Sequence, residues 1–113
     1  MEEYLAKLKE YLNMETELPF AEFAAFFEEF TAFLGANYEQ FDQTTSLNAR
    51  FVASILEANS QERAKRKTPE TKRFKKMAQK SRIWLDAMNY RLLKSGMSQA
   101  QIDKANAEIS DAM

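Results

Sequence analysis

The sequence lacks cysteine and histidine altogether, and its 113 residues include only two glycines and two prolines. Without cysteine there are no disulfides, thiolate metal sites or thiol nucleophiles. Without histidine the commonest general base, metal ligand and pH switch are missing. No glycine-rich phosphate loop is present, and the adjacent carboxylates of Glu28 and Glu29 would not face each other on a helix. We therefore expect no enzyme, no catalytic residues, no metal site and no cofactor.

Long hydrophobic runs are missing as well. No apolar segment approaches the ~20 residues that a membrane-spanning helix needs. The first residues, MEEYLAKLKEY, are acidic and amphipathic, unlike a signal peptide. A chain of this length is sufficient for one hydrophobic core. These features predict one helical domain over residues 1–113, with no membrane span and a cytoplasmic location.

The scarcity of helix-breaking residues favours helix over sheet. Apolar side chains recur at steps of three and four residues along most of the chain, which is the spacing of one helix face. We therefore predict an all-α fold, a bundle of four to five helices in which the third and fourth form a long antiparallel hairpin. The expected helices are 2–13, 19–35, one that begins between 37 and 42 and ends near 67, 69–95, and a short last helix after residue 98.

Capping residues support these boundaries. Gly35 and Gly96 are placed to end helices in the left-handed conformation. Thr68 is a suitable N-cap, and Pro69 suits a first helical position. Two further segments have the spacing of a capping box, namely Asn37 with Gln40 and Ser98 with Gln101.

The second expected helix carries the clearest apolar stripe. Seven of its side chains fall within an arc of about 140°, and we interpret them as core rather than as a ligand pocket. They are Phe20, Phe23, Phe26, Phe27, Phe30, Phe33 and Leu34. The third helix has a weaker stripe that is half polar: Tyr38, Phe41, Thr45, Asn48, Val52, Ile55 and Asn59.

Charge is strongly segregated along the chain, although the net charge is only −1. Residues 1–60 carry 11 acidic and 3 basic side chains, whereas residues 61–113 carry 13 basic and 6 acidic ones. Between Arg63 and Arg82 ten basic residues accompany a single acid, Glu70. The two halves could neutralise each other within a chain or across a dimer, or the basic half could bind an external anion.

The two ends of this basic cluster differ in how their charges affect the stability of the helices that carry them. Lys65, Arg66 and Lys67 would end a helix, where cations are favourable, and Glu62 could pair with Arg66. The lysines after residue 70 instead form like-charge pairs at three and four residues, each costing about 0.2–0.5 kcal/mol. The first hypothesis is therefore a non-catalytic accessory protein that binds a polyanion, the nucleic acid backbone, through this hairpin tip. Its predicted binding residues are Lys65, Arg66, Lys67, Lys72, Arg73, Lys75, Lys76, Lys80 and Arg82.

The alternative hypothesis is a protein–protein interaction module that assembles into a homo-oligomer. Ile83, Ala87 and Tyr90 form a second apolar face on the fourth helix, which predicts either a central buried helix or a dimer contact. The basic tip would then dock on the acidic helices of a neighbour or of another protein. The segment 72–93 also has the pattern of a basic amphipathic helix for a membrane surface or a partner groove, but its apolar residues are more simply core. The segment 92–109 resembles a helix-turn-helix only in outline, because its second helix is acidic.

Overall fold

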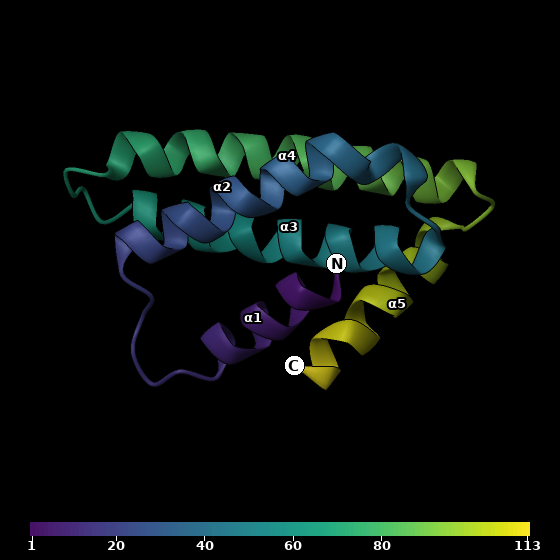
Figure 1. Cartoon of the computed structure of the whole chain (residues 1–113), viewed down its shortest axis with the longest axis horizontal. Helices are drawn as coiled ribbons and strands as arrows, with labels where there is room; N and C mark the ends of the chain where they lie inside the picture. Colours follow the sequence, from purple (N-terminus) through teal and green to yellow (C-terminus); the bar gives the residue numbers. More distant parts are fainter.

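The computed structural model describes all 113 residues and contains helices without any strand (Figure 1). This confirms the all-α prediction, including five helices and a long helical hairpin. None of these helices is long and apolar enough to cross a membrane. The elements are α1 (Glu2–Leu12), α2 (Phe20–Asn37), the short 3₁₀ helix η1 (Tyr38–Gln40), α3 (Gln43–Ala64), α4 (Thr71–Lys94) and α5 (Gln99–Ala112).

The antiparallel pair α3 and α4 forms the long axis of the molecule, and α2 crosses over this pair (Figure 1). Helix α1 packs against both α2 and α3, with the Tyr4 ring beside those of Phe30 and Phe33, whereas α5 packs against the N-terminal part of α3 (Figure 1). Several small side chains are buried along the hairpin, among them Ala49, Ala53 and Ser60 on α3 and Ala78 and Ser81 on α4. Since the distance between packed helices depends on the side chains at the contact, these residues allow a close approach.

The apolar stripe of α2 is core, as predicted. Phe23, Phe26, Phe27, Phe30 and Leu34 are buried, whereas Phe20 and Phe33 at the two ends are half-buried. Burial of one such side chain contributes about 1.5–3 kcal/mol before conformational entropy is subtracted. The stripe therefore holds α2 against the hairpin, and two of its residues, Phe23 and Phe26, also line a cavity.

The predicted stripe of α3 was wrong in detail. Of the predicted stripe only Val52 is buried, and the other buried residues of α3 are Ser46, Ala49, Phe51, Ala53, Leu56, Ser60 and Arg63. Thr45, Asn48 and Asn59, which the periodicity placed on that face, are only half-buried. The error arose because alanine and serine carry little hydrophobic signal, although they pack well at a tight helix contact.

The connection between α2 and α3 also differs from the prediction. Gly35 is not a left-handed cap, because α2 continues through it to Asn37. The Asn37 side chain donates a hydrogen bond to the Phe33 carbonyl at 2.9 Å, so the predicted capping box with Gln40 does not form. After η1, Asp42 is the true N-cap of α3, with its Oδ1 accepting from the Thr45 N–H at 2.8 Å.

The corner between α3 and α4 is longer than the sequence suggested. Helix α3 ends at Ala64, and Lys67 adopts a left-handed conformation with φ of 54°. Pro69 lies in a turn before α4, which begins at Thr71. The Thr68 hydroxyl accepts a hydrogen bond from the Glu70 N–H at 3.3 Å and does not cap the helix itself. The left-handed residue therefore reverses the chain, and the basic residues of the corner lie partly outside helices.

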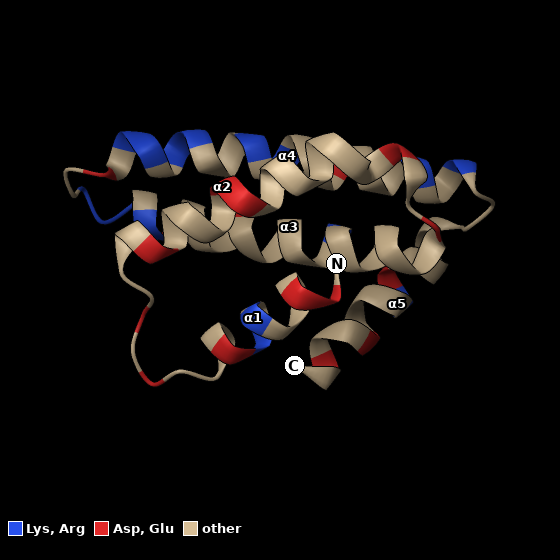
Figure 2. Cartoon of the chain, viewed as in Figure 1, with Lys and Arg blue, Asp and Glu red and all other residues tan.

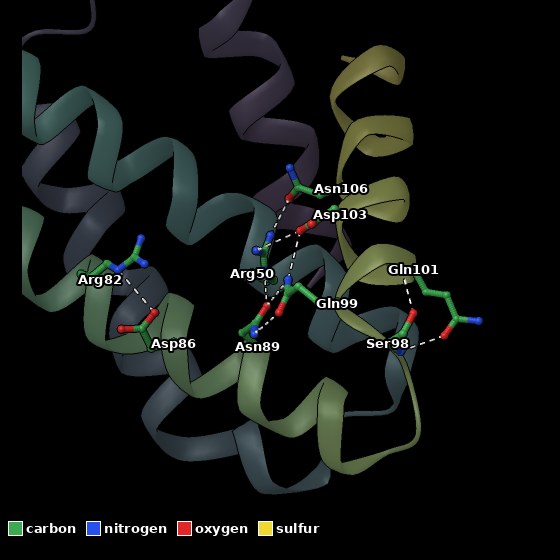
Figure 3. Close-up of polar contacts among 9 residues, drawn as sticks. All are labelled: Arg50, Arg82, Asp86, Asn89, Ser98, Gln99, Gln101, Asp103 and Asn106. Atoms are coloured by element: carbon green, nitrogen blue, oxygen red, sulfur yellow. Dashed lines mark hydrogen bonds and ion pairs between the residues drawn. The ribbon is translucent and has the colours of Figure 1, made fainter.

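The corner between α4 and α5 matches the prediction. Gly96 is left-handed, with φ of 104°, and Ser98 forms the expected reciprocal capping box with Gln101 (Figure 3). The corner is thus an ordinary capped turn between two helices.

A polar network that the sequence analysis missed fastens α5 to the hairpin. Arg50 of α3 donates to the side-chain oxygens of Asn89 at 2.9 Å and Asn106 at 3.2 Å (Figure 3). Gln99 exchanges hydrogen bonds with Asn89 and donates another to Asp103 at 3.0 Å. The Arg50 guanidinium therefore lies at the junction of α3, α4 and α5, and its burial lowers its pKa.

Candidate polyanion-binding surface

The predicted basic residues gather at one end of the molecule. Figure 2 shows them along the N-terminal half of α4, at the end of α3 and on the loop between these helices. All nine of the residues predicted for polyanion binding are exposed. The acidic residues lie mainly elsewhere, on the α1–α2 loop, α1, α2 and α5 (Figure 2). Segregation along the sequence thus becomes segregation in space.

The arginines of this surface are already engaged within the chain. Arg66 holds both carboxylate oxygens of Glu17, at 2.7 and 2.6 Å from its Nη1. This pair replaces the expected one between Arg66 and Glu62, because Glu62 lies instead 3.8 Å from the Lys65 ammonium. The Arg66 hydrogen bond lowers the pKa of Glu17. The α1–α2 loop, far from Arg66 in sequence, is therefore fastened to the hairpin tip.

Arg82 and Arg73 are engaged as well. Arg82 forms ion pairs with Glu57 of α3 and with Asp86 one turn along α4, each at 3.3 Å. The Arg73 guanidinium lies over the Phe20 ring, 4.6 Å from its centroid. Such exposed ion pairs and cation–π contacts are worth about 1 kcal/mol or less each. They nevertheless orient these side chains along the surface of the bundle.

The lysines behave differently. Five of them form no ion pair within the chain, and four of these belong to α4, where like charges recur at three and four residues. These five, the free lysines, are Lys67, Lys72, Lys75, Lys76 and Lys80. The acidic half of the chain therefore pairs with Arg66 and Arg82 of this surface, whereas Arg73 and the free lysines have no carboxylate partner.

Two grooves flank α4 at this end. In the groove towards α3, Lys65, Lys67 and Lys75 meet Gln61 and Thr71, and no carboxylate lines it. The groove towards α2 is lined by Arg73, Lys76 and Lys80 beside Phe27, Glu28 and Met77. The free lysines thus extend over both sides of the α4 ridge.

The start of α4 adds two main-chain donors. The amides of Thr71 and Phe74 donate to the carbonyls of Thr68 and Glu70, whereas those of Lys72 and Arg73 find no acceptor beyond the helix start. Unpaired amides at a helix N-terminus attract anions through both hydrogen bonding and the helix dipole. They lie beside lysines of the same first turns, so donors and positive charge coincide.

The apolar residues predicted for self-association occupy the same outer face of α4. Ile83 is 66% exposed and Tyr90 is 60% exposed, whereas Ala87 is half-buried. Of the two alternatives predicted for this face, the one in which α4 is buried on both sides within one chain is therefore wrong, and the dimer contact stays a prediction. The core face of α4, which includes Phe74, Met88 and Leu92, packs inside the bundle and is unavailable to a membrane.

The sequence analysis did not single out two residues that shape this end of the molecule. Arg63, the first basic residue of the cluster, is only 6% exposed and is buried beside Phe23. Glu17 links the α1–α2 loop to two arginines, Arg63 and Arg66. The only sequence signal for Arg63 is its position, seven residues after Leu56 on the buried face of α3.

Comparisons with protein families, curated proteins and solved structures found no match to this chain.

Proposed function

We propose that this protein is a non-catalytic accessory protein that binds a polyanion, the phosphate backbone of nucleic acid, through the free lysines of the α3–α4 hairpin. The observation that carries the proposal is the absence of any carboxylate partner for these five lysines. Four of them repel one another along α4, at a cost of about 1–2 kcal/mol in total. Phosphates placed between them would remove that repulsion and release counterions from the nucleic acid.

The chemistry of the surface favours binding without sequence specificity. A lysine ammonium is a point charge on a flexible stem, suited to phosphate rather than to base edges. Recognition of base edges relies on arginine, asparagine and glutamine side chains. No helix at the basic end presents a regular row of such side chains. The grooves on both sides of α4 could follow a backbone, with the free amides of Lys72 and Arg73 as additional donors. We place this activity in the cytoplasm, where nucleic acid is accessible.

A salt series tests the proposal. Fluorescence anisotropy with labelled single-stranded and duplex oligonucleotides, between about 50 and 200 mM salt, gives the slope of log K against log salt. Replacement of Lys72, Lys75, Lys76 and Lys80 by glutamine should reduce the slope for duplex DNA by up to about 3.6, since each phosphate contact contributes about 0.9. No binding by the wild-type protein at about 50 mM salt would refute the proposal.

A matched control separates this surface from net charge. Replacement of Lys7, Lys9, Lys94 and Lys104 by glutamine removes the same four charges from exposed positions elsewhere on the chain. We expect this control variant to keep most of the salt slope. Equal losses in the two variants would mean that the affinity is a property of the whole molecule rather than of the hairpin.

A second candidate function, self-association, is favoured by the exposure of Ile83 and Tyr90 beside the lysines. In a homo-oligomer these side chains would be buried, and the basic tip could face the acidic helices of a neighbouring copy. Size-exclusion chromatography with light scattering tests it. The double substitution Ile83→Ser and Tyr90→Ser should dissociate the oligomer, and the four-lysine variant should do so only if the basic tip takes part. A monomeric wild-type protein would exclude this function.

A further inference from the structure

A cavity of about 240 Å³ lies beneath the loop that joins α1 and α2. Figure 1 shows this loop swinging away from the helices that it connects. The cavity is lined mainly by apolar side chains from three helices, with polar groups from the loop and α3. The lining includes Leu8, Tyr11, Phe26, Ile55, Glu17 and Arg63.

Arg63 marks one end of this cavity. The lining residues of α3 are Ile55, Leu56, Asn59 and Arg63, which follow one another along a single helix face. At 1.5 Å of rise per residue, the distance from Ile55 to Arg63 along the helix is about 12 Å. The cavity is therefore elongated along α3, with an apolar end and a cationic end.

The Arg63 side chain is buried without its usual partners. Its side chain is only 7% exposed, and its Nε has no hydrogen-bond partner. The nearest carboxylate oxygen, on Glu17, lies 3.8 Å from that Nε, while the short hydrogen bonds of Glu17 go to Arg66. One carboxylate thus serves two guanidinium groups. Burial lowers the pKa of Arg63, with Glu17 opposing the shift.

Aromatic contacts compensate only in part for the missing hydrogen-bond partner of Arg63. The Arg63 guanidinium lies 4.5 Å from the centroid of the Phe23 ring and 5.7 Å from that of Phe74. Cation–π contacts satisfy the charge, but they leave the buried Nε–H donor unpaired. Buried charges in proteins are normally both paired and hydrogen-bonded. A second carboxylate at this position would supply what Glu17 alone does not.

We propose that this cavity binds a medium-chain fatty acid, with its carboxylate on Arg63 and its alkyl tail along Tyr11, Phe26 and Ile55. The arginine fork matches a carboxylate, which can accept two parallel hydrogen bonds. The apolar lining suits an alkyl chain, and a few polar groups at one end are typical of ligand sites. The volume of about 240 Å³ limits the ligand to a short or medium-length alkyl tail.

Sodium octanoate is the probe, titrated into the full-length protein by isothermal titration calorimetry, with 1-octanol as the neutral ligand of the same chain length. We expect saturable binding of one octanoate per chain and binding of 1-octanol at least tenfold weaker. Amide shifts in two-dimensional NMR should map the octanoate to Leu8, Ile55 and Arg63. Absence of octanoate binding at millimolar concentration, or equal binding of octanol, would overturn the proposal.

Three variants test the role of the charge. Arg63→Gln should weaken octanoate binding at least tenfold, whereas Lys65→Gln, which removes the same charge from an exposed neighbour, should change it less than twofold. Glu17→Gln should tighten binding several-fold, because it removes the carboxylate that competes for Arg63. This gain cannot come from misfolding, so it decides the question even if the Arg63 variant fails to fold by circular dichroism. Unchanged or weaker binding in the Glu17 variant contradicts the assignment.

Discussion

Replacement of either buried serine in the helical hairpin by alanine should stabilise this protein. Ser60 of α3 is 0% exposed and Ser81 of α4 is 2% exposed, and neither hydroxyl has a hydrogen-bond partner. An unsatisfied buried polar group costs about 1–3 kcal/mol. Alanine keeps the Cβ and removes only the oxygen, and it is also the better helix former by roughly 0.5 kcal/mol.

The expected gain follows from these quantities. Removal of the oxygen atom also removes its van der Waals attraction to each neighbouring atom, about 0.1–0.2 kcal/mol per atom pair, which offsets part of the benefit. We therefore expect about 1 kcal/mol of added stability for Ser60→Ala and for Ser81→Ala. In a chain of this size that corresponds to a rise in Tm of about 4 °C. Urea and thermal denaturation, followed by helical circular dichroism, would measure both quantities.

Ser54 provides the matched control on the same helix. Its hydroxyl donates to the Phe51 carbonyl at 2.6 Å, so Ser54→Ala removes a hydrogen bond, whereas the other two substitutions remove none. The gain in helix propensity is the same, and the net effect should be near zero or destabilising. The reasoning is refuted if Ser60→Ala and Ser81→Ala lower the free energy of unfolding, since that would mean that both hydroxyls are satisfied in solution.

Three further substitutions have definite expected outcomes. Gly35→Ala should raise the free energy of unfolding by about 0.5–1 kcal/mol in urea denaturation, because Gly35 lies within α2 and an added Cβ would stand 4.0 Å from Trp84, an ordinary contact; a loss of stability would contradict this. Arg50→Met should cost about 1–3 kcal/mol in thermal denaturation and speed amide exchange in α5, and unaltered exchange there would disprove the anchoring role. The Glu17 pKa is lowered from its usual 4.5 by the Arg66 hydrogen bond, so this ion pair stabilises the fold above pH 4.5 and is lost as pH falls through the folded-state pKa. Glu17→Gln should therefore cost about 0.2–1 kcal/mol at neutral pH and nothing in strong acid, and a deficit that persists in acid would point to packing instead.

Local patterns in the sequence determined much of the fold. The Phe stripe of α2, the core face of α4 and the cap of α5 at Ser98 were all predicted, because each depends on residues three or four apart in one helix. The left-handed Gly96 was also predicted, since glycine has no Cβ to oppose that conformation. The position of the basic cluster at a hairpin tip followed from the same helix boundaries.

Where local signals were weak, the prediction failed. The buried face of α3 was predicted only in part: Val52 is buried as expected, but Ala49, Ala53 and Ser60 were missed because such small side chains give little hydrophobic signal. The start of α3 was predicted only to lie between residues 37 and 42, and the structure places its N-cap at Asp42, the end of that range. The capping box at Asn37 does not form, because the Asn37 side chain donates back to the Phe33 carbonyl.

The sequence by itself determined the helices, their approximate ends and the charge of each half, because these depend on composition and on contacts within one or two turns. Only the tertiary structure decided which charges are paired, since Glu17 meets Arg66 and Arg63 across 49 and 46 positions of the chain. Glu17 thereby engages Arg66 at the hairpin tip and lies beside Arg63 at an apolar cavity, while the lysines of α4 have no carboxylate partner. The sequence does not show which residues so far apart will meet, because such contacts form only when the helices pack together.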